Sequence, residues 1–245
     1  MNIISSLGQR RVSVRRYDHT RYEYRRRFLR FLIRVIGFNL LVKLERVEGL
    51  DNVPQEGPAI LMINHIAFVD PIVVLHVVRR NIVPLAKVEV YNYPVVGIFP
   101  RLWGVIPVRR EEVDRRAIQQ ALEVLRSREI ILVAPEGTRG PQLKEGKEGV
   151  AYLASRSGVP VVPVAIDGTI GYPALRFTSR WRGEGAIVRF GRPFRYKSNL
   201  PRSSREQLRV MTDEAMYILA GLLPENRRGI YSDFSRITLE TIEWV

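Results

Sequence analysis

Short apolar runs alternate with amphipathic stretches along most of the chain. The runs, bounded by glycine, proline or charged residues, predict buried strands at 59–63, 82–86, 104–108 and 129–134. Helical spacing of apolar residues between them predicts helices at 71–79, 111–127 and within 144–157. Strands that alternate with helices predict an α/β fold, with a mixed, largely parallel central sheet flanked by helices.

Two later segments extend this fold. The run at 159–166 predicts a strand, and its prolines, Pro160 and Pro163, cannot donate to a ladder. We therefore expect this strand near a sheet edge or at a bulge. Residues 185–190 predict a further strand, and residues 203–223 predict a long helix that begins at a serine cap.

Residues 22–44 have helical periodicity and a basic stripe. Arg26, Arg30 and Arg34 recur at four-residue spacing. The broader side is apolar and carries Phe28, Leu29, Leu32, Val35, Ile36 and Val42. Such a helix either lies in a membrane interface, apolar side down with its arginines among lipid phosphates, or docks on its own protein with a solvated basic face. We favour the membrane, and divide the chain into a basic amphipathic helical arm, 1–48, and a folded domain, 49–245.

Charge supports an anionic partner for this arm. The net charge is +14, and residues 1–34 hold ten arginines against Asp18 and Glu23. The partner is a nucleic acid, a membrane surface or a phosphorylated substrate. The arginines are interleaved with bulky aliphatic residues instead of exposed aromatic platforms, and no nucleic-acid-binding motif is present. We therefore expect no nucleic-acid partner.

Several classes of protein are disfavoured by what the sequence lacks. It has no cysteine, which excludes disulfides, thiolate zinc sites and a cysteine nucleophile. It shows neither metal-ligand spacing nor a glycine-rich dinucleotide loop, so we expect no metal or cofactor. Residues 1–11 lack the apolar core of a signal peptide. Residues 28–42 are too short to span a bilayer and contain two arginines, so no transmembrane segment is predicted.

The turn at 64–71 (NHIAFVDP) brings a histidine and a carboxylate together. Asp70 followed by Pro71 predicts a helix start, since Asp is a favoured N-cap and proline suits the first turn. A carboxylate bonded to one ring nitrogen orients a histidine so that the other nitrogen takes a proton. Ala67 and the lack of cysteine leave no protein nucleophile beside the pair, so His65 would activate a substrate hydroxyl. The alternative is structural, with Asp70 as a cap and His65 as a core histidine.

Charged side chains follow three other predicted strands. Lys87 and Arg110 each lie at the end of one strand, and the turn PEGTRG after a third strand carries Glu136 and Arg139. Arginine suits phosphate because its forked donors match two oxygens. Residues 89–103 are aromatic and apolar, and either line a groove for an apolar ligand or, as we predict, pack into the core.

The order of these motifs resembles the glycerolipid acyltransferases, specifically the 1-acyl-glycerol-3-phosphate (lysophosphatidic acid) acyltransferase family. Four sequence blocks carry the resemblance: Asn64 and His65 with Asp70, GVIPVRR at 104–110, EGTR at 136–139 and VPVVPV at 159–164. The resemblance implies that His65 is the general base on the glycerol hydroxyl and that Asp70 orients it. Members often have serine two residues after the histidine, where this chain has Ala67, so a hydroxyl contribution there is not expected.

The resemblance also implies roles for the basic strand ends. Arg110 and Arg139 would bind the substrate phosphate, with Lys87 as a weaker ligand. The other matching residues would hold the head group, orient Arg139 or shape the turn: Glu136, Gly137 and Thr138.

The implied reaction moves a fatty acyl group from acyl-CoA or acyl-carrier protein to the sn-2 hydroxyl of lysophosphatidic acid, giving phosphatidic acid. Glycerol 3-phosphate or another lysophospholipid is the alternative acceptor. The implied partner is a membrane lipid surface, with the enzyme peripheral or monotopic on the cytoplasmic face and residues 49–245 as its catalytic domain. A binding-only relative is disfavoured, because the catalytic pair and the EGTR turn are both present.

Overall fold

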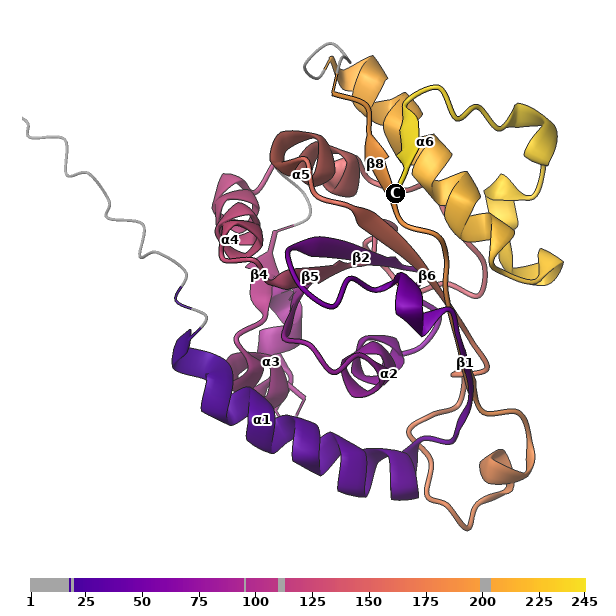
Figure 1. Cartoon of the computed structure of the whole chain (residues 1–245). Helices are drawn as coiled ribbons and strands as arrows, with labels where there is room; N and C mark the ends of the chain where they lie inside the picture. The colour runs from indigo at the N-terminus through magenta and orange to yellow at the C-terminus, as the bar shows by residue number, and fades with distance from the viewer. Residues whose placement is uncertain (1–17, 19, 95, 110–112, 199–203) are drawn as a thin grey trace, which may run out of the picture.

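The computed structural model describes residues 18, 20–94, 96–109, 113–198 and 204–245. Their strands form one sheet, in the order β1-β7-β6-β2-β5-β3-β4, with β8 beside β6 and β9 beside β8 (Figure 1). The strands are β1 (Leu44–Glu48), β2 (Ala59–Ile63), β3 (Ile82–Lys87), β4 (Ile106–Val108), β5 (Ile130–Val133), β6 (Val161–Asp167), β7 (Ala186–Phe190), β8 (Phe194–Tyr196) and β9 (Ile242–Trp244).

The sheet is mixed and largely parallel, which confirms the predicted fold class. The five strands β6, β2, β5, β3 and β4 run parallel to one another, and β7 is antiparallel to β6. Strand β1 pairs with β7, so residues 44–48 lie in the same sheet as the rest of the chain. The carboxyl ends of the five parallel strands therefore meet at one edge of the sheet, where open α/β sheets place their ligands.

Helices cover both faces of the sheet (Figure 1). They are α1 (Glu23–Leu32), α2 (Asp70–Val77), α3 (Ile98–Trp103), α4 (Arg115–Arg126), α5 (Gly149–Ser157) and α6 (Arg205–Gly221). Alternate residues of β2 point to opposite faces: Ile60 and Met62 pack with α4, α5 and α6, whereas Leu61 and Ile63 pack with α2 and Trp103 of α3. Burial on both sides explains why this strand is continuously apolar.

Strand β6 lies inside the sheet, so the predicted edge position is wrong. It pairs with β2 on one side, and on the other side with β8 at Val161 and with β7 from Val164 onward. Pro163 lies where the strand changes from one partner to the other, and its carbonyl accepts a 2.8 Å hydrogen bond from the Gly191 N–H. Proline is tolerated at this point because the ladder is interrupted there.

The N-terminal helix turns Arg26 and Arg30 of its basic stripe toward the protein, whereas Arg34 is exposed. Arg26 is fully buried, and its Nε donates a 2.7 Å hydrogen bond to the Trp103 carbonyl. The Arg30 guanidinium donates to the carbonyls of Arg79 and Arg80 and, at 2.9 Å, to Asn81 Oδ1. Burial lowers the pKa of Arg30. Neither expected orientation of the stripe holds for Arg26 and Arg30, since they contact backbone carbonyls instead of water or lipid phosphates.

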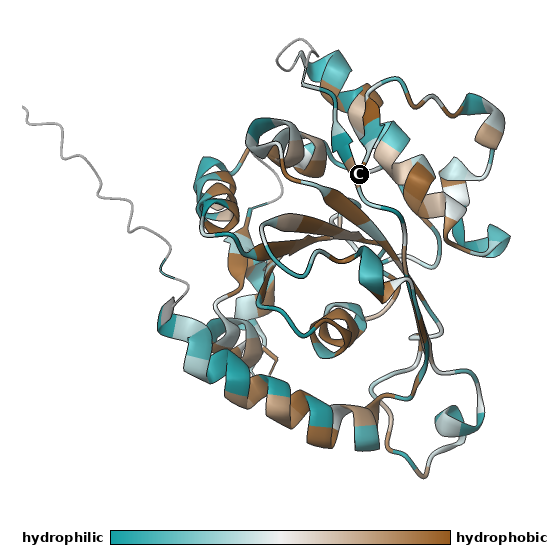
Figure 2. Ribbon diagram, in the orientation of Figure 1, coloured by the Kyte–Doolittle hydropathy of each residue, from teal (hydrophilic) through white to brown (hydrophobic). Residues whose placement is uncertain are grey.

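Large apolar side chains lie on the outer side of the same helix. After Leu32 the helix continues as a π-helical segment, η2 (Ile33–Leu41). Its inward side chains, among them Phe38 stacked on His76 with ring centroids 3.6 Å apart, pack against the core. The exposed ones are Tyr24, Phe28, Phe31, Val35, Ile36 and Leu40. Figure 2 shows that hydrophobic residues gather toward the second half of this helical stretch.

In the part of the chain that the structure describes, every helix is too short or too polar to cross a bilayer.

Candidate active site

The site forms at the carboxyl edge of the sheet, where β2 ends and its neighbour β6 continues. Asn64, the first residue after β2, is buried and bridges the two strands. Its Nδ2 donates to the Ile166 carbonyl at 2.8 Å, and its Oδ1 accepts from the Ile166 N–H at 2.7 Å. This side-chain pairing replaces ladder hydrogen bonds at the strand end, and it fixes the point at which the next residue, His65, leaves the sheet.

The structure brings His65 and Asp70 into contact. The His65 Nδ1 lies 3.0 Å from Asp70 Oδ2, and the same oxygen accepts hydrogen bonds of 2.7 Å from the N–H groups of Ile66 and Ala67. The other oxygen, Oδ1, accepts a 2.6 Å hydrogen bond from the Thr169 hydroxyl. Asp70 is fully buried, and these donors offset the loss of water around its charge. The imidazole retains 18% exposure, which leaves Nε2 as the nitrogen available to a substrate.

Asp70 does not cap the helix as predicted. It is the first residue of α2, whose N-cap is Val69, and its carboxylate faces back to the turn that precedes it. One oxygen contacts His65 and the N–H groups of the turn, and the other accepts from Thr169, two residues after the end of β6.

Glu136 holds the backbone of the histidine. One of its oxygens accepts from the His65 N–H at 3.2 Å, and the other accepts from the Lys144 N–H at 3.0 Å. The Gly140 N–H donates to the His65 carbonyl at 2.9 Å, so the loop after β5 contacts both sides of this residue. Burial raises the pKa of Glu136 to about 7, against the backbone hydrogen bonds that lower it. In these contacts Glu136 organises His65 instead of Arg139.

The turn after β5 has the shape expected from its glycine. Gly137 has φ 66°, a left-handed conformation that glycine adopts at no steric cost, and its N–H donates to the Ala134 carbonyl. Thr138 and Arg139 are exposed. Since Arg139 precedes Gly140, its backbone lies next to that of His65. The exposed Arg139 guanidinium can therefore reach a ligand that is bound at His65.

Of the other predicted phosphate ligands, Lys87 lies farther along the same edge. Lys87 ends β3 and is half-buried, and β5 separates β3 from β2. The strand spacing puts the backbone of Lys87 roughly 10 Å from β2, and the end of β4 roughly 14 Å from it. Arg110 lies outside the described residues; Arg109, next to it, is exposed.

The aromatic stretch 89–103 divides between core and surface. Trp103 is buried, and its indole N–H donates to the Ile82 carbonyl at 2.8 Å. The predicted core packing is thus confirmed for this residue. The first part of the stretch instead lines a surface hollow of about 380 Å³: Tyr91, Asn92, Tyr93, Pro94, Gly97, Ile98 and Arg101.

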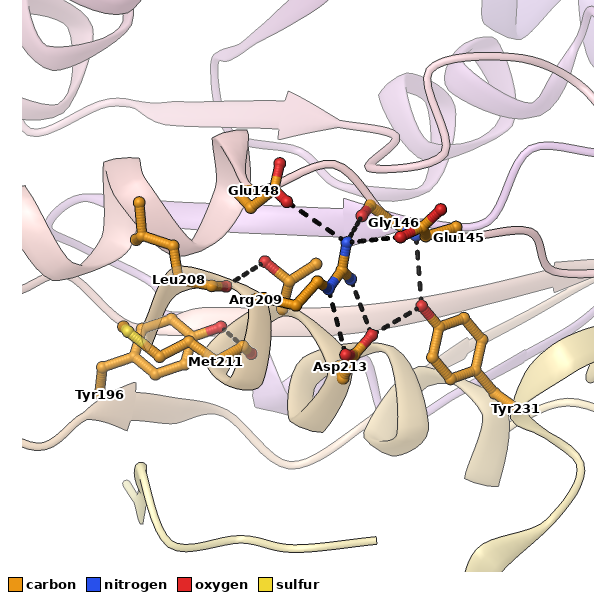
Figure 3. A network of polar contacts seen from close by, with 10 residues as sticks. Glu145, Gly146, Glu148, Tyr196, Leu208, Arg209, Met211, Asp213 and Tyr231 are labelled. Atoms are coloured by element: carbon orange, nitrogen blue, oxygen red, sulfur yellow. Dashed lines mark hydrogen bonds and ion pairs between the residues drawn. The ribbon is translucent and has the colours of Figure 1, made fainter. Parts of the chain in front are cut away.

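A network of hydrogen bonds and ion pairs joins α6 to the loop 140–148 (Figure 3). The Arg209 guanidinium forms two hydrogen bonds with Asp213, at 3.1 and 2.7 Å, and donates to the Gly146 carbonyl at 2.7 Å. The Tyr231 hydroxyl donates to Asp213 Oδ1 at 3.1 Å and accepts from the Gly146 N–H at 3.3 Å. The Lys144 N–H, which donates to Glu136, belongs to this loop. The contacts of the loop with α6 and the C-terminal segment therefore help to hold Lys144 in place beside Glu136.

Sequence reasoning missed two kinds of residue. Thr169 lies 99 residues from Asp70, and only its place just after a predicted strand marks it. Arg209 and Tyr231 lie outside every motif, and the tail that contains Tyr231 shows no recognisable chemistry in the sequence. A polar residue one or two positions after a buried strand is the signal that would have found Thr169.

Comparison with protein families assigns the chain to a class. The family model described as Acyltransferase matches residues 45–167, which is about half of the chain and includes His65, Asp70, Glu136 and Arg139. The chain belongs to this acyltransferase family.

Curated relatives of the chain have a more specific name than the family model does. The chain is 30% identical over 156 residues to 1-acyl-sn-glycerol-3-phosphate acyltransferase LPAT1, chloroplastic, of Arabidopsis thaliana, covering 60% of this chain and 43% of that one. It is 33% identical over 127 residues to the 1-acyl-sn-glycerol-3-phosphate acyltransferase of Borreliella burgdorferi, covering 50% and 51%. The chain thus spans about half the length of these curated relatives. The resemblance to this family found in the sequence motifs is confirmed.

A solved structure shares the fold. The 1-acyl-sn-glycerophosphate (LPA) acyltransferase PlsC from Thermotoga maritima superposes with a TM-score of 0.54. The match covers 83% of this chain and 77% of that one, at 22% sequence identity. The likeness shows that the two proteins have the same architecture.

Proposed function

We propose that this protein transfers a fatty acyl group from an acyl thioester, acyl-CoA or acyl-carrier protein, to the sn-2 hydroxyl of lysophosphatidic acid, giving phosphatidic acid. The single observation that carries the proposal is the buried Asp70, bonded to His65 at the carboxyl edge of the sheet. Membership of the acyltransferase family and the names of the relatives support the reaction class.

The geometry suits general-base catalysis. His65 Nε2 takes the proton of the acceptor hydroxyl while the oxygen attacks the thioester carbonyl, forming a tetrahedral intermediate. That intermediate collapses with cleavage of the carbon–sulfur bond, and the imidazolium returns the proton to the leaving thiolate. Asp70 fixes the tautomer through Nδ1 and stabilises the imidazolium, a contribution on the order of 100- to 10,000-fold in rate. No covalent enzyme intermediate is needed.

The basic strand ends bind the acceptor's phosphate in this proposal. Arg139 is exposed beside the histidine and is the principal ligand, because its forked donors match two phosphate oxygens. Lys87 adds charge farther along the edge, and Arg110, outside the described residues, is kept as a further phosphate ligand on the resemblance of its motif alone. This arrangement recognises a hydroxyl at the histidine and a phosphate within reach of the arginine.

We place the enzyme on the cytoplasmic face of a membrane as a peripheral or monotopic protein. The support is the outer side of α1 and η2, where Phe28 and Phe31 are 61% and 60% exposed. Moving such side chains from water into the interface is favourable by roughly 1.5–3 kcal/mol each when burial is complete. The acceptor, itself a lipid, is then met at the surface where it resides.

An acceptor panel tests the reaction. Purified protein is given a long-chain acyl-CoA with lysophosphatidic acid, glycerol 3-phosphate or lysophosphatidylcholine, and the free thiol is measured. We expect thiol release that depends on an acceptor and is fastest with lysophosphatidic acid. Glycerol 3-phosphate as the best acceptor would replace the preferred substrate by the alternative one, and equal thiol release without any acceptor would overturn acyl transfer.

A further inference from the structure

The loop between β6 and β7, residues 168–185, holds apolar side chains out in water at its tip. Phe177 is 84% exposed, Leu175 two residues before it is 46% exposed, and Ile170 nearer the base of the loop is 47% exposed. Single exposed apolar residues are normal on protein surfaces, but an almost completely exposed phenyl ring in a loop with two further exposed aliphatic side chains is an unfavourable arrangement in water alone.

The exposure is imposed by hydrogen bonds within the loop. Arg180 donates through Nε to the Ile170 carbonyl at 2.7 Å and through its two terminal nitrogens to the carbonyls of Glu184 and Gly168. The Trp181 indole N–H donates to the Ala174 carbonyl at 2.6 Å. The loop is therefore cross-braced at its base, and its fold keeps the tip from collapsing onto the protein.

The loop lies beside the end of the N-terminal helical stretch. The Ala174 N–H donates to the Leu41 carbonyl, the last residue of η2, at 2.8 Å, and Lys43 Nζ donates to the Gly183 carbonyl at 2.9 Å. In Figure 1 the orange loop lies next to the end of the indigo helix. The end of η2 and the loop are therefore in contact, and each carries exposed apolar side chains, Ile36 and Leu40 on η2 and Phe177 on the loop.

Charge around the tip favours an anionic surface. Arg176 and Arg182 are exposed, and the only acidic residue in this described loop is Glu184. The guanidinium of Arg176 lies over the Trp181 ring, 5.9 Å from its centroid, which keeps it near the apolar tip. An apolar tip next to Arg176, in a loop whose net charge is positive, matches a membrane interface, where lipid phosphates lie just above the acyl chains.

The base of the loop is part of the candidate active site. Thr169, which donates to Asp70, is the loop's second residue, and its neighbours Gly168 and Ile170 are the ones bound by Arg180. Contact between the tip and lipid would thus fix the catalytic edge relative to the membrane surface through a short, braced connection.

We propose that the loop 168–185 is a second lipid-contacting element, with Phe177 entering the interface of an anionic membrane beside α1 and η2. The inference rests on the membrane attachment in the proposed function and adds a separate point of contact. The occupant is a lipid surface, since the loop combines an apolar tip with a net positive charge.

A fluorophore attached to a single introduced cysteine tests the proposed loop contact, because the chain contains no native cysteine. The full-length variants Phe177→Cys, Ile36→Cys and Ile230→Cys each carry one polarity-sensitive fluorophore. Ile230 is 59% exposed in the yellow C-terminal segment, which Figure 1 shows at the other end of the molecule from α1. With vesicles of phosphatidylcholine and phosphatidylglycerol, we expect a blue shift at positions 36 and 177 and none at 230.

Binding to the same vesicles provides the second measurement. We expect Phe177→Ser to weaken vesicle binding roughly tenfold, with Ile230→Ser unchanged and acylation of a monomeric short-chain acceptor retained by both. A shift at 36 without one at 177 would overturn the loop contact and leave attachment through η2 standing. Equal binding to pure phosphatidylcholine would overturn the anionic partner, and no shift at either position would overturn both membrane contacts without touching the chemistry.

Discussion

Two regions of the molecule place polar and apolar groups in opposite ways. One is the catalytic edge, the carboxyl edge of the sheet that holds the candidate site, and the other is the outer layer formed by α1 and η2. At the edge, the polar atoms of Asn64, Asp70 and Glu136 are buried and hydrogen-bonded to named partners within the chain. In the outer layer, Arg26 is buried while Phe28 and its apolar neighbours face solvent. The first region is complete within the protein, whereas the second leaves apolar surface for something outside the chain to cover.

This difference separates two kinds of constraint. A buried carboxylate with four donors is destabilising if any one partner is lost, so the edge is specified by internal hydrogen bonds. The exposed ring of Phe28 contributes little to folding, so its presence points to an external surface. Variants at the edge should therefore change chemistry, and variants on the outer layer should change attachment.

The largest effect should come from the charge of Asp70. In Asp70→Asn the amide oxygen can still accept from His65 and the turn, while the amide nitrogen faces the Thr169 hydroxyl, which can accept. The fold should survive, but the imidazolium loses its counter-charge. We expect kcat to fall about 100- to 10,000-fold, measured by thiol release, with the thermal unfolding midpoint nearly kept. Activity close to that of the wild type would contradict the role of the pair.

Arg26 tests whether the basic stripe belongs to the protein. Removing a buried arginine that binds the Trp103 carbonyl leaves that acceptor unsatisfied, so Arg26→Ala should lower the free energy of unfolding by about 2–3 kcal/mol. The exposed Arg25→Ala is the matched control and should change it by less than about 0.5 kcal/mol. Urea unfolding measures both, and equal small effects would show that Arg26 is not structurally engaged.

Glu136 should make the free energy of unfolding depend on pH. Because burial raises its pKa from 4.5 to about 7, the folded state keeps this proton between those values while the unfolded state releases it. Its contribution to the free energy of unfolding is therefore present below pH 4.5 and is lost as pH rises through about 7. The loss is on the order of 3 kcal/mol. Glu136→Gln cannot titrate, so the variant should lack this component in urea unfolding between pH 5 and 8; identical pH profiles would refute it.

The smallest effect concerns the network of Figure 3. Arg209→Met removes the donor to the Gly146 carbonyl and should lower the free energy of unfolding by about 1 kcal/mol. It should also reduce kcat/KM severalfold, because the loop that supplies Lys144 to Glu136 loosens. The exposed Arg205→Met on the same helix is the control. A loss of stability in Arg209→Met with kcat/KM unchanged would mean that the network supports the fold alone.

The parts predicted correctly are those with local causes. Strand β2 is a short apolar run, and His65 meets Asp70 because a turn of only four residues separates them. Contacts with distant residues had no such signature: Thr169 reaches Asp70 across 99 residues, and Arg209 reaches the Gly146 carbonyl across 63, only through the packing of the whole fold. Chain distance, not unusual chemistry, hid them.

Two errors have a physical explanation. Proline in β6 suggested an edge strand, but Pro163 lies at a change of partner inside the sheet. For the N-terminal helix, periodicity identifies two sides without saying which one faces the body. The backbone carbonyls of Trp103 and of residues 79–80 lie under the helix, and arginines, with apolar stems and several donors, suit that surface better than phenyl rings do.

The most direct test of the general-base proposal is the rate of acyl transfer by His65→Gln. Glutamine keeps a donor toward Asp70 but cannot take up a proton near neutral pH. With acyl-CoA and lysophosphatidic acid, the account predicts that kcat falls about 100- to 10,000-fold while circular dichroism and the unfolding midpoint match those of the wild type. Turnover by this folded variant at the wild-type rate would contradict it.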